Sequence, residues 1–373
     1  MNLCILQNSE IDREEWSRLV RESRTGTWFQ TPEAYDFFAS QPELFHPFVV
    51  GVYSHPLPAL RGVCVGYVTV EKNPIKQFFT RRAIIIGGPC LADDCSEEEV
   101  IELLKGVRET ASLQLSPEGE RGTAQNPPVT GGSKRGLSSL FLGRDGAGSP
   151  IYIETRNLND YSRWRRAFEK AGFDYQPHLN FHVDCTDKAK MWERLSDNRK
   201  RQIKKAIKNG AEIKTDEITE ADIKEWYSIL NDLYHTRVKT PLFPLSFFLD
   251  FFRRGRGKYI LVMHEGVVIG GIMCPIMKDK CIYEWYVCGN DTKYKSQNPS
   301  VMATYAALDY ACERGLPLFD FMGAGQPDEP YGVRDFKSRF GGELVEHGRF
   351  LCITKPLLYR IGVLGVKILK GIK

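Results

Sequence analysis

Apolar residues in the first half of the chain occur in two spacings, and each spacing predicts a different element. Runs rich in Val, Ile and aromatic residues, separated by Gly and Pro, predict strands. Apolar residues that recur every three or four positions predict helices, and Ser96 with Glu99 forms a capping box that marks the start of one. The predicted elements after the N-terminal helical patches are strands at 45–53, 62–70 and 81–89, a helix from 96, a strand at 151–156, a short helix at 160–171 and a strand at 178–185.

The second half of the chain repeats these patterns. Its three apolar strand-like runs are joined by links short enough for hairpins, and a later helix has Pro299 in its first turn and Gly315 after its end. The predicted elements are helices at 191–210, 219–236 and 245–253, strands at 258–264, 267–277 and 281–289, a helix at 299–314, a strand at 318–323, a short helix at 332–340 and strands at 343–348 and 349–354.

Both halves therefore share one order, in which three antiparallel strands precede a helix, a strand, a helix and a strand. This order is similar to the GNAT acyltransferase fold, and it predicts an α/β (α+β) protein with two tandem GNAT-like domains. Each domain is expected to hold a mixed, mainly antiparallel sheet flanked by helices. We place the domains at 1–185 and 186–373, and we predict a disordered insertion at 116–150, which is rich in Gly, Pro and Ser.

Composition and charge limit the class of protein. The 373 residues are 42% hydrophobic and 26% charged, as in an ordinary globular protein, and no apolar run is long enough for a membrane helix. The first residues carry charges too early for a signal peptide. The ten cysteines include no CxxC pair and are expected to be buried free thiols, which favours a reducing cytoplasm. The net charge of +4 does not select a partner.

Three motifs in the second half carry more specific information. A basic helix contains R-x-I-K-K-A-x-K-N-G from Arg201 to Gly210, and the following amphipathic helix ends with Tyr234 and Arg237. The most diagnostic motif is F-D-F-x-G followed by G-V-x-x-F-K-x-x-F-G, which runs from Phe319 to Gly341. With these motifs, nearly the whole chain resembles the FemABX family of aminoacyl transferases, which form peptidoglycan interpeptide bridges.

The resemblance implies an enzyme that needs no cofactor. Members of this family transfer an amino acid from aminoacyl-tRNA to an amine on a UDP-linked or lipid-linked cell-wall precursor. An amine attacks the ester directly, so a side-chain nucleophile is unnecessary, and the chain has no G-x-S-x-G elbow. The reaction instead needs positioning and positive charge near the oxyanion.

Lys337 is the candidate for this charge, because it lies between two phenylalanines of the motif and matches the family lysine implicated in oxyanion stabilisation. A surface lysine on a short helix is the alternative interpretation. The resemblance also suggests Arg237 for precursor phosphates, which suits the bidentate geometry of arginine, although a solvated arginine at a helix end fits the spacing equally well. The other candidates for substrate binding are Tyr234, Asp320, Gly323, Arg334, Phe336 and Phe340.

The basic helix is the candidate for contact with nucleic acid or phosphate, through Arg199, Arg201, Lys204 and Lys205. A plain solvated face is the alternative. Asp320 could equally order its own loop by hydrogen bonding. A metal site is not expected, because His178 and His182 lie in a strand-like run without a third ligand nearby.

The N-terminal segment departs from the family pattern, and the C-terminal tail allows two interpretations. Family members that use UDP-linked precursors often carry a lysine after an N-terminal Q-S-x-x-W, whereas FQTPEAYDFF at 29–38 has none, so the acceptor stays open. The tail at 355–373 is apolar with interspersed Lys and Arg. It could form an amphipathic helix at the inner membrane face or pack on the first domain.

Two other functions are compatible with this fold order. A CoA-dependent GNAT-type N-acyltransferase needs a Gly-rich turn whose N–H groups hold the pyrophosphate. The corresponding turns, GGPCLADDCS at 87–96 and GNDTKYKSQNPS at 289–300, lack the R/Q-x-x-G-x-G/A pattern, which argues against CoA. The second alternative is a non-catalytic binding protein built from degenerate GNAT domains.

Overall fold

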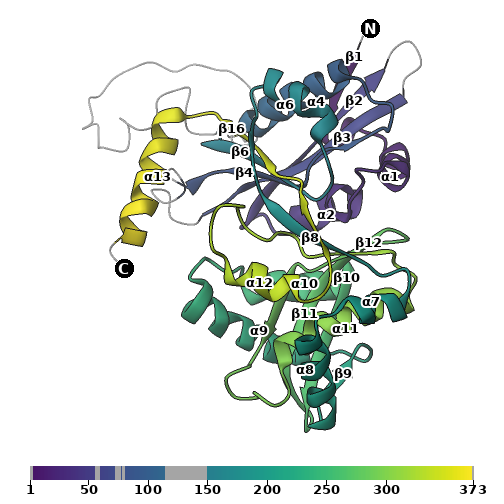
Figure 1. The fold of residues 1–373 in the computed structure, drawn as a ribbon. Coiled ribbons are helices and arrows are strands. Elements are labelled where there is room, and N and C mark those ends of the chain that lie inside the picture. Colours follow the sequence, from purple (N-terminus) through teal and green to yellow (C-terminus); the bar gives the residue numbers. More distant parts are fainter. Residues whose placement is uncertain (1–2, 55–58, 72–76, 78–79, 114–148, 372–373) are drawn as a thin grey trace. The chain divides into compact units, whose positions relative to one another are not determined.

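The computed structural model describes residues 3–54, 59–71, 77, 80–113 and 149–371 (Figure 1). Most of the insertion predicted at 116–150 lies outside these residues. The chain forms two compact units. Unit 1 comprises 1–156, 163–175 and 350–373, and unit 2 comprises 157–162 and 176–349. All ten cysteines are free thiols.

Unit 1 is built on one sheet with the strand order β1-β2-β3-β4-β6-β16-β7, and β5 pairs with β3. Helix α4 packs on β2 and β3, and α6 packs against α4 (Figure 1). Helix α2 also contacts β2 and β3, and α1 contacts β3. The strands are β1 (Leu3–Gln7), β2 (Phe45–Ser54), β3 (Ala59–Thr69), β4 (Ala83–Gly87), β5 (Cys90–Leu91), β6 (Tyr152–Asn157), β7 (Asp174–Gln176) and β16 (Arg349–Ile353). The helices are α1 (Arg13–Glu22), α2 (Pro32–Ala39), α4 (Glu97–Leu113), α6 (Arg165–Lys170) and α13 (Pro356–Gly371).

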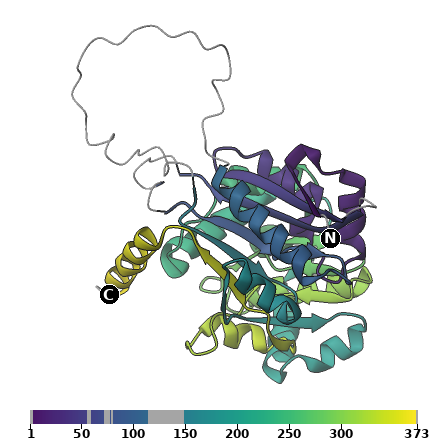
Figure 2. The same cartoon turned by 90° about the horizontal axis from the view of Figure 1, so that it is seen from above.

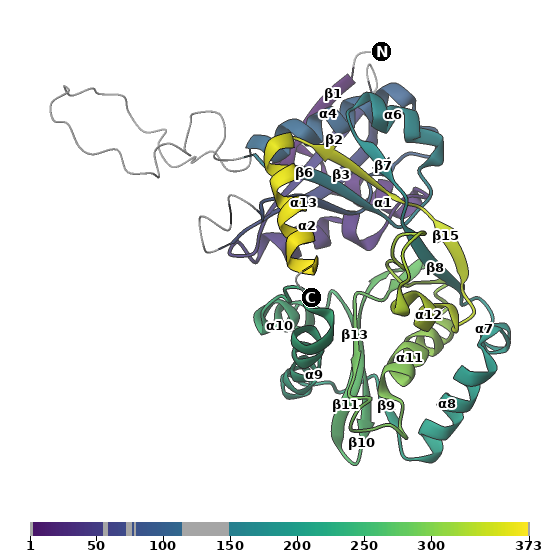
Figure 3. The same ribbon diagram turned by 60° about the vertical axis from the view of Figure 1, so that its left-hand side comes forward.

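Unit 2 has a second sheet, with the order β15-β8-β14-β12-β11-β10-β9, and β13 pairs with β11. Figure 3 shows α11 and α8 on one side of this sheet and α9 and α10 on the other. The strands are β8 (Leu179–Asp184), β9 (Glu212–Lys214), β10 (Gly257–His264), β11 (Val267–Met277), β12 (Cys281–Tyr283), β13 (Tyr286–Gly289), β14 (Leu318–Asp320) and β15 (Glu343–Glu346). The helices are α7 (Lys188–Arg194), α8 (Asp197–Lys208), α9 (Glu220–Leu233), α10 (Leu245–Arg253), α11 (Pro299–Glu313) and α12 (Gly332–Ser338).

Each unit contains a strand from the half of the sequence that otherwise forms the other unit. Strand β8 was expected to close the first domain, but it pairs with β14 and β15 of unit 2. Strand β16 was expected to finish the second domain, but it lies between β6 and β7 of unit 1. Hydrophobic periodicity locates a strand but does not show which strand it pairs with. The domain boundary expected at 185 therefore missed this exchange of strands.

Three predicted elements are divided in the structure. The helix expected at 191–210 breaks at Ser196, whose side chain accepts a hydrogen bond from Arg199 N and so caps α8. Helix α9 continues as one π-helical turn, Tyr234–Val238. The strand expected at 281–289 divides into β12 and β13, which leaves Glu284 and Trp285 at the break.

Candidate functional site

The break between β12 and β13, at Glu284 and Trp285, marks the point where the parallel strands β12 and β14 of unit 2 separate. β12 and β14 pair in parallel up to Tyr283 and Asp320. The Glu284 amide donates one further hydrogen bond to the Asp320 carbonyl, at 2.9 Å, and β13 then continues along β11. Glu284 therefore lies where the strands part, a position at which side chains can be presented between two diverging strands.

A buried polar cluster occupies this point. The Glu284 side chain is 2% exposed, and its Oε1 lies 3.3 Å from Lys337 Nζ of α12. The Thr304 hydroxyl of α11 donates to Glu284 Oε2 at 3.2 Å. Burial raises the pKa of Glu284, and the charge and hydrogen bond of Lys337 and the hydrogen bond of Thr304 oppose that rise.

All three N–H donors of Lys337 have partners. Besides the contact with Glu284, Nζ donates to the Phe321 carbonyl at 2.7 Å and to the Gly323 carbonyl at 2.9 Å. The side chain is 11% exposed. Lys337 thus fixes the loop after β14, in which Met322 and Gly323 have positive φ angles of 56° and 126°. The alternative of a free surface lysine does not fit this burial.

Asp320 orders the same loop from the other side of β14. Its Oδ1 accepts from Asn180 Nδ2 at 2.7 Å and from the Met322 amide, and its Oδ2 lies 3.1 Å from His182 Nε2. The side-chain oxygen Oδ1 of Asn180 in turn accepts a hydrogen bond from Gly323 N at 2.7 Å. The structural role considered for Asp320 is therefore present, and His182 is one of its partners.

The two histidines near Asp320 shift in opposite directions. Burial lowers the pKa of His182, but the hydrogen bond and charge of Asp320 outweigh it, so the net pKa is raised. Burial and the nearby His182 lower the pKa of His347, whose ring centroid lies 5.1 Å from that of His182. His178 instead contacts Arg349, with 3.0 Å between His178 Nε2 and the guanidinium. The part of the chain that the structure describes contains no group of three His, Cys, Asp or Glu placed to hold a metal.

Three further candidates in the 319–341 motif, Arg334, Phe336 and Phe340, make contacts within the chain. Arg334 donates to the carbonyls of Ala324, Gln326 and Pro327 and so fastens the loop before α12. Phe336 and Phe340 pack against each other with ring centroids 5.3 Å apart. These rings hold α12, and with it Lys337, against unit 2.

Arg199 lies apart from the basic face on which sequence analysis placed it. The residue is 3% exposed, its guanidinium stacks 4.3 Å from the Phe336 ring centroid, and it donates to the Phe336 carbonyl at 3.0 Å. Burial and the nearby Arg339 lower its pKa to about 10. Arg199 therefore supports α12 and is not presented to a phosphate. Arg201, Lys204 and Lys205 are exposed on α8, together with Lys208.

Tyr234 and Arg237 lie in the π-helical turn after α9. Tyr234 is half-buried near Tyr286, with ring centroids 6.3 Å apart, and burial raises its pKa to about 12. Arg237 is exposed and donates to the Thr292 hydroxyl at 3.3 Å. It lines a pocket of about 110 Å³ with residues from the end of α9 and the turn after β13, among them Asp232, Thr236 and Asp291.

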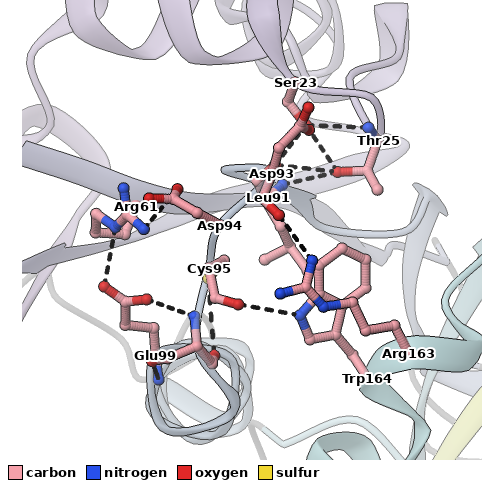
Figure 4. Close-up of polar contacts among 11 residues, drawn as sticks. Ser23, Thr25, Arg61, Leu91, Asp93, Asp94, Cys95, Glu99, Arg163 and Trp164 are labelled. Carbon is pink, nitrogen blue, oxygen red and sulfur yellow. Dashed lines mark hydrogen bonds and ion pairs between the residues drawn. The ribbon is translucent and has the colours of Figure 1, made fainter.

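The helix N-termini that could cradle a pyrophosphate carry carboxylates of the chain itself. In unit 2, Asp291 accepts from the Ser300 amide of α11 at 3.2 Å and from the Ser300 hydroxyl. In unit 1, Glu99 caps α4 by accepting from Ser96 N at 2.7 Å, and Arg61 joins Glu99 at 3.0 Å to Asp94 at 2.7 Å (Figure 4). A bound phosphate would meet like charge at both positions.

Sequence analysis did not identify Glu284, Thr304 and Asn180 as members of the site. A signal for Glu284 existed, since it is the single acid in the apolar run CIYEWYVCG at 281–289. Thr304 and Asn180 carry no comparable signal, because their hydrogen bonds depend on pairings between distant segments.

Comparison with known proteins agrees with this architecture. Residues 194–338 match the family model described as an Acetyltransferase (GNAT) domain, and no curated protein matches the chain. Among solved structures, FemX is similar with a TM-score of 0.65 and 13% identity over 95% of this chain and 99% of that chain. L-PGS from Bacillus licheniformis has a TM-score of 0.52 and 10% identity over 95% and 96%. A tandem GNAT protein from the clavulanic acid biosynthesis pathway has a TM-score of 0.51 and 10% identity over 94% and 98%.

These matches confirm the predicted fold class, an α/β protein with two GNAT-like domains and a FemABX-like fold. The GNAT model over 194–338 identifies the chain as an acyl-transfer enzyme, as predicted. Within the described ranges, no helix is long and apolar enough to span a bilayer.

Proposed function

We propose that the chain moves an aminoacyl group from aminoacyl-tRNA to an amine of a peptidoglycan or related cell-envelope precursor. The observation that carries this proposal is the carboxylate of Asp291 at the N-terminus of α11. An acyl-CoA enzyme of this fold needs that terminus for the pyrophosphate, and a carboxylate there repels it. The likeness of the fold to FemX and L-PGS supports transfer of an aminoacyl group at the level of fold.

The chemistry needs one positive charge near the reacting ester. The acceptor nitrogen attacks the ester carbon, the bond to the tRNA 3′ oxygen breaks, and the amine proton leaves with that oxygen or with solvent. Lys337 is proposed to stabilise the oxyanion, and its position at the parting strands supports that role. Because its three donors are engaged, it acts either through its charge or by exchanging one carbonyl for the oxyanion.

The proposed donor contact is the exposed basic face of α8, formed by Arg201, Lys204, Lys205 and Lys208. For the acceptor, we propose that the exposed guanidinium of Arg237, together with Tyr234, binds the phosphates of a UDP-linked or lipid-linked precursor. Asp232 and Asp291 line the same pocket of about 110 Å³, so the phosphates are expected on the side of Arg237, away from these two carboxylates. The free guanidinium donors of an exposed arginine suit this role, whereas buried Arg199 does not.

The test is a donor and acceptor screen with the purified full-length chain. Mixed labelled aminoacyl-tRNAs are supplied with UDP-linked and with lipid-linked precursors, and label on the precursor is measured by mass spectrometry. Titration calorimetry with charged tRNA and with acetyl-CoA runs in parallel. Transfer from tRNA with no heat from acetyl-CoA is the expected result, and saturable acetyl-CoA binding would refute the donor assignment.

One observation favours a second function, a CoA-dependent N-acyltransferase, because the model that matches 194–338 describes an acetyltransferase domain. An Asp291→Asn variant separates the two functions. If CoA is the donor, removing the carboxylate strengthens acetyl-CoA binding, since like charge is lost at the helix terminus. If tRNA is the donor, acetyl-CoA stays unbound in both proteins.

A further inference from the structure

Helix α13 follows the last strand of unit 1 and exposes a row of apolar side chains. Leu357 is 73% exposed, Ile361 47% and Leu364 59%. These positions are four and three residues apart, so they lie on one helical face. Figure 2 shows α13 projecting from the end of β16, beside the sheet of unit 1 rather than over it.

Helix α13 contacts the rest of unit 1 through the helical face opposite this apolar row. The Tyr359 ring packs on Tyr152 with centroids 5.6 Å apart, and Thr354 N, just before the helix, donates to the Ile151 carbonyl at 3.0 Å. Tyr359 is half-buried, whereas the exposed row points away from this contact. The helix thus has a fixed first turn and an uncovered apolar face.

Charge along this segment is of one sign. From 347 to 373 the sequence contains six Lys or Arg residues and no Asp or Glu. Arg360 is exposed and lies three residues after Leu357 and four before Leu364, so a cation borders the apolar row. An apolar row bordered by a cation, on a segment without acidic residues, matches the interface of an anionic bilayer, where apolar side chains enter the acyl boundary and cations meet headgroups.

We propose that α13 is a peripheral membrane-binding helix for an anionic lipid surface, with Leu357, Ile361 and Leu364 inserted. A second copy of the chain fits less well, because facing α13 helices would bring like charges together. Nucleic acid would leave the apolar row without a partner. The helix lies in the interface rather than across it, since no described helix can span a membrane. The proposal does not depend on the donor or the acceptor of the transfer reaction.

The experiment is flotation of the full-length chain with vesicles of phosphatidylcholine alone and of phosphatidylcholine with phosphatidylglycerol. The wild type is expected to float with the anionic vesicles and less with the neutral ones. The double variant L357E/L364E is expected to lose at least tenfold in partition coefficient, because it places carboxylates in the inserted face. Arg360→Gln should weaken anionic binding by about fivefold, the effect of one cation near such a surface.

The matched control is V267E/L344E, which adds the same charge at apolar positions of unit 2 that are 47% and 50% exposed. It should float like the wild type, and circular dichroism should confirm that both double variants are folded. Absence of flotation, or equal flotation of L357E/L364E, would overturn the proposal. A dimer of the wild type in sedimentation velocity that L357E/L364E abolishes, without flotation, would assign the face to a second copy instead. The double variant E284Q/K337M, which keeps no lone buried charge, should float normally, so loss of transfer chemistry leaves this test unaffected.

Discussion

At the scale of single residues, Lys337 and Glu284 form a buried pair of opposite charges. Removing only the lysine leaves a buried carboxylate without its cation. We expect Lys337→Met to lower the free energy of unfolding by about 3–5 kcal/mol, as for other broken buried pairs. Transfer should fall by at least about a hundredfold if the cation stabilises the oxyanion. Denaturant unfolding and single-turnover transfer measure the two effects.

The double variant E284Q/K337M separates stability from chemistry. It removes the lone charge, so most of the lost stability should return, while activity should stay low if Lys337 is catalytic. Recovery of both stability and activity would show that Lys337 only holds the loop after β14. Glu284→Gln alone controls for the carboxylate.

The shifted pKa values of His182 and His347 predict how the stability of the folded chain depends on pH. The pKa of His182 is raised in the folded chain, so its stabilisation is complete below its unfolded value of about 6.5 and is lost as pH rises through the folded pKa. His182→Asn should therefore cost more stability at acidic than at alkaline pH. The pKa of His347 is lowered, so His347 penalises folding as pH falls, and His347→Asn should relieve that penalty. Urea midpoints at several pH values test both signs, and parallel pH profiles for the two variants would contradict them.

Sequence motifs predicted some of these residues but not their neighbours. The motif around Lys337 drew attention to this lysine, and the structure finds it buried beside another charge. Arg199 could not be separated from its basic neighbours by sequence alone. It is buried because its guanidinium packs on Phe336, a residue far away in the sequence. Asn180 and Asp320 are 140 positions apart, and no local pattern can indicate their hydrogen bond.

At the scale of elements, α8 carries exposed cations on the face opposite its buried Ile203 and Ala206. If this face binds tRNA phosphates, K204Q/K205Q should weaken binding and reduce the slope of log K against log salt by about one for each lost contact. The control K224Q/K278Q removes two exposed lysines elsewhere in unit 2 and should leave the slope unchanged. Filter binding across a salt series measures both. Equal slopes for all three proteins would favour the plain solvated face.

Element positions were largely predictable, because hydrophobic period and caps are local properties. Helix α10 and strand β11 have the bounds that periodicity predicts. The break of β12 from β13 was not predictable, since it depends on the parallel partner β14 that shares only part of the strand. The π-helical turn after α9 likewise leaves no mark in the spacing of apolar residues.

At the scale of the whole molecule, the C-terminal segment completes the sheet of unit 1. Phe350 of β16 stacks on Phe168 with centroids 3.8 Å apart, and its amide donates to the Thr155 hydroxyl at 3.1 Å. Truncation after 348 should therefore prevent cooperative folding, since loss of one buried phenylalanine alone costs about 3–5 kcal/mol. Truncation after 355 keeps β16 and should unfold cooperatively. Thermal unfolding and gel filtration of the two truncations test this contrast.

Strand order is the least predictable property of this chain. The duplicated order of elements correctly predicted two domains of one kind, yet equal halves suggested a boundary that β8 and β16 do not respect. Pairing depends on which strand edges are left open after the local hairpins form, and that is a property of the assembled sheet.

The exchange of β8 and β16 also bears on how the chain is made. Translation delivers the N-terminal segment first, but the gap between β6 and β7 can be filled only by residues 349–353, which are translated after every other strand of unit 1. Until then unit 1 presents two open strand edges, which invite pairing with other chains. Unit 2 also waits for a late strand, because β15 of its sheet directly precedes β16 in the sequence. A ribosome-bound chain that stops before residue 349 should therefore leave unit 1 sensitive to protease although most of its strands are already made, which departs from the usual N-terminal-first order of domain folding.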